Sequence, residues 1–186
     1  MNVKGVVFIT GKTTIIKAFG EERWHSFIAK LAAKDEYFSN MIMSVTPIPV
    51  DKFILFLDEM SMEFFNNDKM QYVTFGKVAA QYALSQDGPY RSYLLTKYIK
   101  QFVESVMPKL WSTYFDGGIT TAWIENNIVH FKITGLPIKH HYFEYLVMGY
   151  CQKALKIFGK KTVAHKVNSI SSGDSDIYFQ FELMDA

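Results

Sequence analysis

The side chains with the most obvious chemistry are five histidines and one cysteine. The histidines are His25, His130, His140, His141 and His165. His140 and His141 are adjacent, so on a helix they would point about 100° apart and could not bind one metal ion from the same face. His140 and Glu144 have i,i+4 spacing and supply half of a metal site, but the sequence indicates no further ligands. We therefore expect no metal centre.

A haem ligand and a reactive thiol are the next possibilities. His25 follows Trp24 and is a formal candidate for an axial haem ligand. A lone histidine on an amphipathic helix is more often a surface residue, so we favour that simpler interpretation. Cys151 is the only cysteine, which excludes an internal disulfide and indicates a reducing compartment. We expect its thiol to be buried and structural.

A nucleotide site and an acid–base pair are also excluded by spacing. The segment 11–14, Gly-Lys-Thr-Thr, resembles the end of a phosphate-binding loop. Five residues separate Gly5 from Gly11, however, where that motif has four. Asp58, Glu59 and Glu63 have the spacing of a solvated helix face rather than of a catalytic pair. We therefore expect a protein that is not an enzyme.

Aromatic side chains are the most unusual feature of the composition. The chain has 16 Phe, 11 Tyr and 3 Trp, or 16% aromatic residues. Aromatic residues with polar tips can line an apolar ligand pocket, and the same residues can form an ordinary packed core. The candidate ligand-binding residues are Tyr98, Phe102, Trp111, Tyr114, Phe143 and Tyr150.

Length and charge narrow the class of protein. A chain of 186 residues is expected to form a single domain, 1–186, with one core. A net charge of +2 gives no field that would favour nucleic acid or an anionic membrane as partner. The chain contains no apolar run long enough for a membrane span and no signal-peptide pattern, so we expect a cytoplasmic protein.

The periodicity predicts an N-terminal part, 1–115, that is mainly helical. The apolar residues recur at helical spacing in four segments: Glu21–Ala33, Asp51–Phe65, Lys69–Ser85 and Tyr90–Met107. Asp51 is the expected cap of the second helix, and Pro108 is expected to kink the fourth helix or to start a new turn.

In the remaining part, 116–186, the sequence pattern predicts two strand pairs around one long helix. Residues 119–125 and 128–134 flank Asn126-Asn127, which suits a type I′ hairpin turn. The long helix is predicted from His140 to Phe158, with Gly159 as its stop, and strands are predicted at 163–169 and 177–183. The fold class is therefore α+β, with N-terminal helices packed on a four-stranded antiparallel sheet.

Two segments carry a family resemblance. Residues 110–118, Leu-Trp-Ser-Thr-Tyr-Phe-Asp-Gly-Gly, and residues 169–181 around Gly173-Asp174 resemble an uncharacterised bacterial family. That family is distantly similar to the 4-vinyl-reductase-type ligand-binding domain, to haem-dependent nitric-oxide sensors and to the Bet-type subunits of vesicle-tethering (TRAPP) complexes.

The resemblance implies a commonly dimeric fold with a cavity for apolar or tetrapyrrole-like molecules. Ser169 and Ile177 stand where relatives often have cysteines, so no metal or thiol role of that pair is implied here. The tyrosine–serine–arginine motif that holds the haem carboxylates in the sensors is missing, because residues 90–93 read Tyr-Arg-Ser-Tyr.

Two functions from different classes remain open. The first is a non-enzymatic sensor or adaptor that binds an apolar small molecule, without a cofactor. The second is a protein-interaction module with a fully packed core and a regulatory protein as its partner. A haem-binding sensor or an enzyme ranks below both. The five consecutive apolar residues 53–57 also predict a homodimer with Phe56 at the interface.

Overall fold

The computed structural model describes residues 1–95 and 98–185 and has the predicted α+β class. Its contacts divide the chain into two compact units. The first unit comprises Met1–Asp68 and Thr113–Asp116, and the second comprises Lys69–Ser112 and Gly117–Ala186. The single domain expected from chain length stays a prediction. No helix among the described residues is both long and apolar enough to span a membrane.

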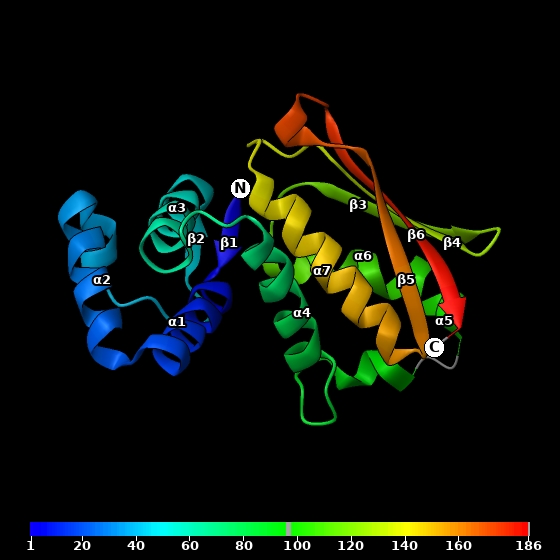
Figure 1. The fold of residues 1–186 in the computed structure, drawn as a ribbon, viewed down its shortest axis with the longest axis horizontal. Coiled ribbons are helices and arrows are strands. Elements are labelled where there is room, and N and C mark those ends of the chain that lie inside the picture. The colour runs from blue at the N-terminus through cyan, green and yellow to red at the C-terminus, as the bar shows by residue number, and fades with distance from the viewer. Residues whose placement is uncertain (96–97, 186) are drawn as a thin grey trace. The chain divides into compact units, whose positions relative to one another are not determined.

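The first unit is mainly helical (Figure 1). Its helices are α1 (Gly5–Phe19), α2 (Glu21–Lys34), the 3₁₀ turn η1 (Glu36–Ser39) and α3 (Val50–Phe65). Two short strands, β1 (Asn2–Lys4) and β2 (Pro47–Pro49), pair antiparallel, and Val3 forms a bridge with Phe115. The Asn2 side chain also donates a 2.8 Å hydrogen bond to Asp116. The segment 113–116 is thereby attached to the N-terminal strand.

Aromatic rings form the core of the first unit. The Phe8 ring lies 4.6 Å from that of Phe56 and 5.7 Å from that of Trp24, measured between centroids. Phe56 is only 1% exposed. Phe56 is therefore buried inside its own unit, and the prediction that it forms a dimer interface is wrong. The stripe 53–57 is wide because α3 is packed on more than one side.

One local sequence prediction in this unit also needs correction. Asp51 does not cap α3: the N-cap is Pro49, and no side chain makes a capping hydrogen bond there. The Gly11-Lys12 segment lies inside α1, so it forms no loop at all. The prediction that it binds no nucleotide rests on the spacing argument alone.

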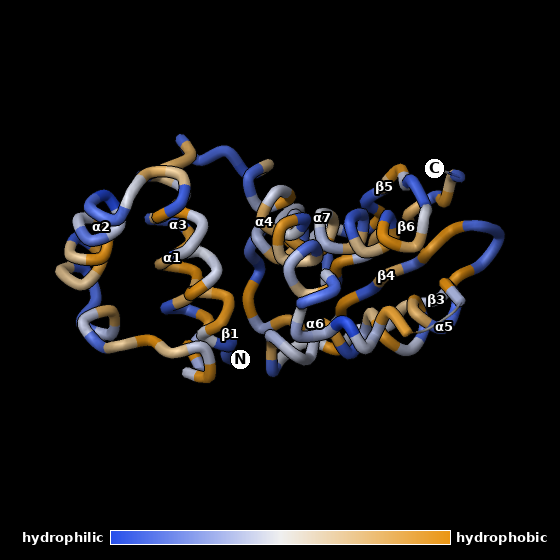
Figure 2. The backbone as a smooth tube through the Cα atoms, turned by 90° about the horizontal axis from the view of Figure 1, so that it is seen from below, coloured by the Kyte–Doolittle hydropathy of each residue, from blue (hydrophilic) through white to orange (hydrophobic). Residues whose placement is uncertain are grey.

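The second unit contains the predicted four-stranded antiparallel sheet. The strands are β3 (Ile119–Glu125), β4 (Ile128–Thr134), β5 (Lys160–Asn168) and β6 (Asp176–Asp185), in the order β3-β4-β6-β5. Asn126 and Asn127 have φ angles of 48° and 65°, as a type I′ turn requires. Figure 2 shows this turn as a hydrophilic tip on the β3–β4 hairpin. β5 begins before the predicted residue 163, at Lys160.

The two faces of the sheet differ. Val129, Phe131 and Ile133 of β4 are buried, as are the alternate residues of β6 from Ile177 to Leu183. On this side α7 (His141–Ile157) packs against β5 and β6. His130, on the opposite face, is also buried and is only 8% exposed. Neighbouring aromatic side chains on the opposite face cover it, as described below.

Helices α4 (Met70–Ala83) and α7 run side by side in close contact (Figure 1). Two glycines make this approach possible. A methyl group at Gly76 would lie 2.1 Å from the Leu146 carbonyl oxygen, and one at Gly149 would lie 2.0 Å from the Val73 carbonyl oxygen. Both distances are shorter than any van der Waals contact. The two backbones therefore touch where any larger residue would separate the helices.

The fourth predicted helix differs most from its prediction. Residues 91–95 form the 3₁₀ helix η2, and the part of the prediction at 96–97 lies outside the described residues. A helix then begins at Ile99 and includes α5 (Ile99–Gln101), a π-helical segment η3 (Phe102–Val106) and α6 (Met107–Tyr114). Pro108 does not end this helix. Proline lacks an N–H and crowds the carbonyl four residues earlier, and the wider π turn before it relieves both problems.

Candidate functional site

The structure separates the six predicted binding residues into three groups. Phe102, Trp111 and Phe143 are buried, Tyr98 is 71% exposed, and Tyr114 and Tyr150 are intermediate. Tyr114 belongs to the first unit, and the other five belong to the second. The six residues stay a predicted binding set, but they do not form one continuous lining.

The three buried residues, Phe102, Trp111 and Phe143, form ring contacts between the helix 99–114 and the α7 region. The Trp111 ring lies 6.1 Å from the Phe143 ring in an edge-to-face arrangement, and Phe102 lies 4.4 Å from Phe158. Trp111 Nε1 donates a 2.9 Å hydrogen bond to the Gly117 carbonyl. The polar end of the indole is therefore satisfied inside the protein, as expected for a buried tryptophan.

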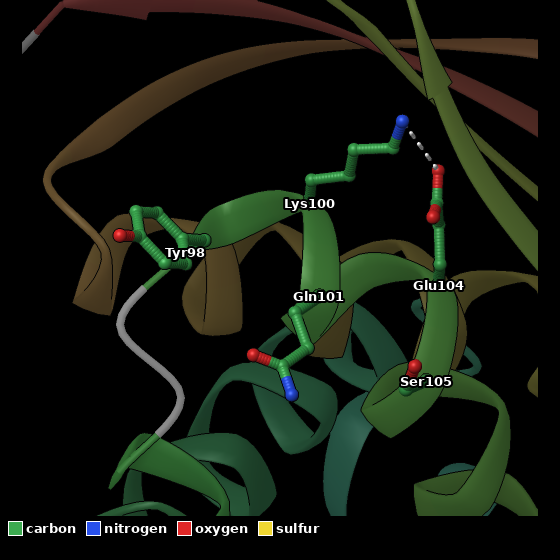
Figure 3. Close-up of a pocket in the computed structure, with 5 residues that line it drawn as sticks. All are labelled: Tyr98, Lys100, Gln101, Glu104 and Ser105. Atoms are coloured by element: carbon green, nitrogen blue, oxygen red, sulfur yellow. Dashed lines mark ion pairs between the residues drawn. The ribbon is translucent and has the colours of Figure 1, made fainter.

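A pocket of about 480 Å³ lies over the first turns of this same helix (Figure 3). Its lining residues are Tyr98, Lys100, Gln101, Glu104 and Ser105. Lys100 and Glu104 extend to one side of the helix, with 3.9 Å between Nζ and Oε1, and Gln101 and Ser105 extend to the other. The site offers a cation, a carboxylate, an amide, a hydroxyl and a phenol. All five are accessible to a ligand from solvent.

Sequence reasoning identified only Tyr98 of these five residues. The other four are polar residues on the exposed side of an amphipathic helix, which is their ordinary location. The i,i+4 spacing of Lys100 and Glu104 predicts an ion pair but not a hollow. A wider helical turn adjacent to a pocket is a recurrent feature of functional sites, and no sequence pattern other than Pro108 indicated it here.

The histidines and the cysteine do not assemble into a metal site. No group of three potential metal ligands is present among the described residues. His25 and His165 have side chains that are 69% and 57% exposed. Cys151 is buried, which raises the pKa of its thiol and opposes formation of a thiolate. The expected structural role of Cys151 agrees with this burial.

Glu144 is the most deeply buried carboxylate in the described chain, with no exposed surface. Its oxygens accept hydrogen bonds from Lys166 Nζ at 2.7 Å, from the Ser171 N–H at 2.8 Å and from the Ser169 hydroxyl at 2.9 Å. Burial by itself raises the pKa of Glu144, but these three donors outweigh it and hold the pKa below its ordinary value. Every interaction connects α7 to the segment between β5 and β6 or to β5 itself, so we interpret this cluster as structural.

A second polar cluster lies on the sheet face opposite α7. The Trp123 and His130 rings stack with centroids 4.6 Å apart and planes only 2° from parallel. His130 Nδ1 and the Tyr178 hydroxyl are 2.7 Å apart, and Gln180 donates to the same hydroxyl at 3.3 Å. From the sequence, His130 was only a possible metal ligand, and no pattern gave a reason to expect a stack.

The structure is similar to solved structures of H-NOX domains. It matches the NO-bound Fe(II) H-NOX protein from S. oneidensis with a TM-score of 0.73 and 13% identity, over 98% of this chain and 99% of the other. The unliganded Fe(II) H-NOX protein from K. algicida gives a TM-score of 0.71 at 12% identity, over 98% and 97%. A Cs H-NOX mutant that carries 4-cyano-L-phenylalanine gives 0.70 at 14% identity, over 98% and 97%. No family model and no curated protein sequence matches the chain.

The chain therefore has the fold of H-NOX domains along nearly its whole length. This confirms the predicted likeness to the fold of haem-dependent nitric-oxide sensors. The matches do not bear on the predicted likeness to 4-vinyl-reductase-type and Bet-type proteins. An identity of 12–14% defines the fold and leaves the ligand to be argued from this chain's own residues.

Proposed function

We propose that this chain is a sensor domain that binds a small molecule and is not an enzyme. The observation that carries the proposal is the match to H-NOX structures over 98% of the chain. Two of those structures hold NO or CO in the Fe(II) state, so this fold accommodates a small ligand in those proteins. A cytoplasmic location, inferred from cysteine usage, is part of the same proposal.

Haem is the group that the fold neighbours imply, and the donor set of this chain does not fit it. The His130 ring stacks on Trp123, its Nδ1 lies 2.7 Å from the Tyr178 hydroxyl, and the residue is only 8% exposed. His140 Nδ1 accepts the Tyr142 N–H at the start of α7.

The other haem donors fit no better among the described residues. His141 packs against Tyr72, with 5.4 Å between ring centroids. None of the five residues that line the pocket is a histidine or a cysteine. Tyr90 and Tyr93 stack on each other at 5.9 Å, in place of a tyrosine–serine–arginine carboxylate clamp. We therefore propose a ligand other than haem.

The pocket over helix 99–114 is the proposed ligand site. An apolar molecule with one polar end would place that end near Lys100 or Gln101 and its apolar part against Tyr98. Opposite the pocket, the same helix packs through Phe102 and Trp111 against the α7 region. Ligand binding at η3 would therefore shift contacts that reach α7, which is how a sensor could pass on its state.

Ligand extraction and thermal stabilisation test this proposal. Native mass spectrometry of freshly purified protein should reveal a bound small molecule. A medium-chain fatty acid at about 100 times its Kd should raise Tm by about 5 °C or more. Tyr98→Ala should abolish most of this shift, whereas Tyr82→Ala should keep it because Tyr82 is 60% exposed on α4 and is absent from the pocket lining. Equal shifts in both variants would contradict the proposed site.

The second candidate is a protein-interaction module without a ligand. The close packing of Phe102 on Phe158 and of Trp111 on Phe143 favours it, because those predicted binding residues are occupied by their neighbours. Absence of any extracted molecule, together with no stabilisation by fatty acids or apolar dyes, would favour this candidate. We propose a homodimer under either function.

A further inference from the structure

The two edge strands of the sheet have opposite character. β5 carries Lys160, Lys161 and Lys166, together with a bulge between Lys166 and Asn168. Lysines and bulges on an edge strand prevent it from pairing with another sheet. β3 reads Ile-Thr-Thr-Ala-Trp-Ile-Glu, without lysine, arginine, proline or glycine, and it forms a regular ladder with β4. Of the two edges of this sheet, the β3 edge therefore has neither lysines nor a bulge, while η3 packs against the same strand.

The side chains of β3 that face away from α7 are also accessible. Ile119 is 70% exposed, and Thr121 and Glu125 are exposed. Trp123 is partly exposed and contacts the rings of His130 and Tyr178, both on the inner side of this edge strand. The Trp123 and His130 rings are parallel and belong to directly opposed residues of neighbouring strands.

We propose that β3 pairs antiparallel with β3 of a second copy of this chain, about a two-fold axis at Trp123. In this register Trp123 lies opposite the partner's Trp123, so the two side chains are cross-strand neighbours. A two-fold symmetric interface brings the same surface of two copies together, so that surface must be complementary to itself. An edge strand meets this condition because it can pair antiparallel with its own copy. The paired sheets would then contain eight strands with β5 at both outer ends.

The charges on this face agree with that register. Thr121 would lie opposite the partner's Glu125, and Thr121 is the neighbour of Lys132 across the β3–β4 ladder. Glu125 has no ion pair among the described residues. The partner's Lys132 would lie two strands away from Glu125, a distance that the two long side chains can span together. Lys132 already pairs with a carboxylate of its own chain. Two such contacts form, one on each side of the axis. Pairing of β5 with β5 would instead bring lysines together.

This register pairs five residues of each β3, 121–125, which gives a small interface, so the dimer should be concentration-dependent. Sedimentation equilibrium over a wide concentration range should show a mass rising from 21.5 kDa toward twice that value. Trp123→Lys places two ammonium groups opposite each other and removes the stack, and it should raise the dissociation constant about tenfold or more. A single species of 21.5 kDa at every concentration would overturn the proposal.

Two further variants separate the interface from a general effect of charge or stability. Glu125→Lys leaves the Trp123 stack intact and should also weaken the dimer, which keeps the test valid if Trp123→Lys does not fold. Val163→Lys adds a positive charge to the β5 edge, where Val163 is 42% exposed, and should leave the dissociation constant unchanged. Equal weakening by Val163→Lys and Glu125→Lys would overturn the choice of β3.

A crosslinking experiment tests the register directly. Thr121→Cys and Glu125→Cys variants, mixed and oxidised, should form a disulfide between copies, because directly opposed residues have Cβ atoms close enough for that bond. Either variant oxidised alone should crosslink far less. Cys151 is buried and should not compete. Equal crosslinking with and without mixing would overturn the two-fold axis at Trp123.

Discussion

The two compact units hold their helices together in different ways. In the first unit, aromatic rings separate the helices: Gly11 of α1 faces the edge of the Phe56 ring, and Phe8 packs on the same ring. In the second unit, α4 and α7 touch through their backbones at Gly76 and Gly149, and α7 is further fixed by the buried Glu144. Rings can shift by a few tenths of an ångström, whereas backbones in contact and a buried charge cannot. The contact between α4 and α7 should therefore tolerate substitution less than the ring contacts between the helices of the first unit.

Removal of the buried carboxylate should have the largest effect. Glu144→Ala leaves the Lys166 ammonium and the Ser171 N–H without their acceptor. Breaking one side of such a buried pair typically costs about 3–5 kcal/mol. Urea unfolding followed by circular dichroism measures the change. A loss below about 1 kcal/mol would mean that water replaces the carboxylate and that the cluster does not fix α7.

Two matched glycine substitutions compare the units directly. Alanine in place of glycine normally stabilises a helix by about 0.5–1 kcal/mol. Gly149→Ala should instead destabilise by about 1–3 kcal/mol, because the added methyl would lie 2.0 Å from a backbone oxygen. Gly11→Ala should be nearly neutral, since its methyl would lie 3.3 Å from the movable Phe56 ring. Denaturant unfolding of both variants measures the two changes. Equal changes in the free energy of unfolding for Gly149→Ala and Gly11→Ala would contradict the proposed difference between the two units.

Acid should act on the second unit through Glu144. Its pKa is lower in the folded protein than in the unfolded chain, so the unfolded state binds the proton more readily. The stabilisation is present above the ordinary glutamate pKa of about 4.3 and is lost as the pH falls through the folded value. Glu144→Gln should flatten the dependence of the unfolding free energy on pH between about pH 5 and pH 2. An unchanged slope would show that other carboxylates carry the acid sensitivity.

The smallest effect is expected on the surface of the first unit. Lys34 Nζ lies 2.6 Å from Glu59 Oε2, but the lysine side chain is 49% exposed. Solvent screens such pairs, so Lys34→Ala should change the free energy of unfolding by about 0.2–1 kcal/mol. Chemical denaturation at low and at high salt measures this change. A loss above about 2 kcal/mol would show that ion pairs, rather than rings, hold α2 on α3.

For the hairpin turn, α2, the Pro108 helix and Phe56, the sequence predictions that depend on neighbouring residues were correct, and those that depend on residues far apart in the sequence were not. The Asn126-Asn127 turn was predictable because its two positive φ angles depend on two residues. Helix α2 was predictable at Glu21–Lys34 because its apolar spacing is local. The Pro108 helix was mispredicted because the π-helical segment that accommodates the proline depends on how the helix packs. Phe56 was assigned to a surface because its burial partners, Phe8 and Trp24, lie far away in sequence.

The sequence alone therefore determined the α+β class, the hairpin and the long helix before Gly159. These properties follow from periodicity and turn chemistry, which act within a few residues. Only the tertiary structure decided which aromatic residues pack together and which strands form the two edges of the sheet. Each of these depends on contacts between segments far apart in the chain, and no local pattern specifies which segments will meet.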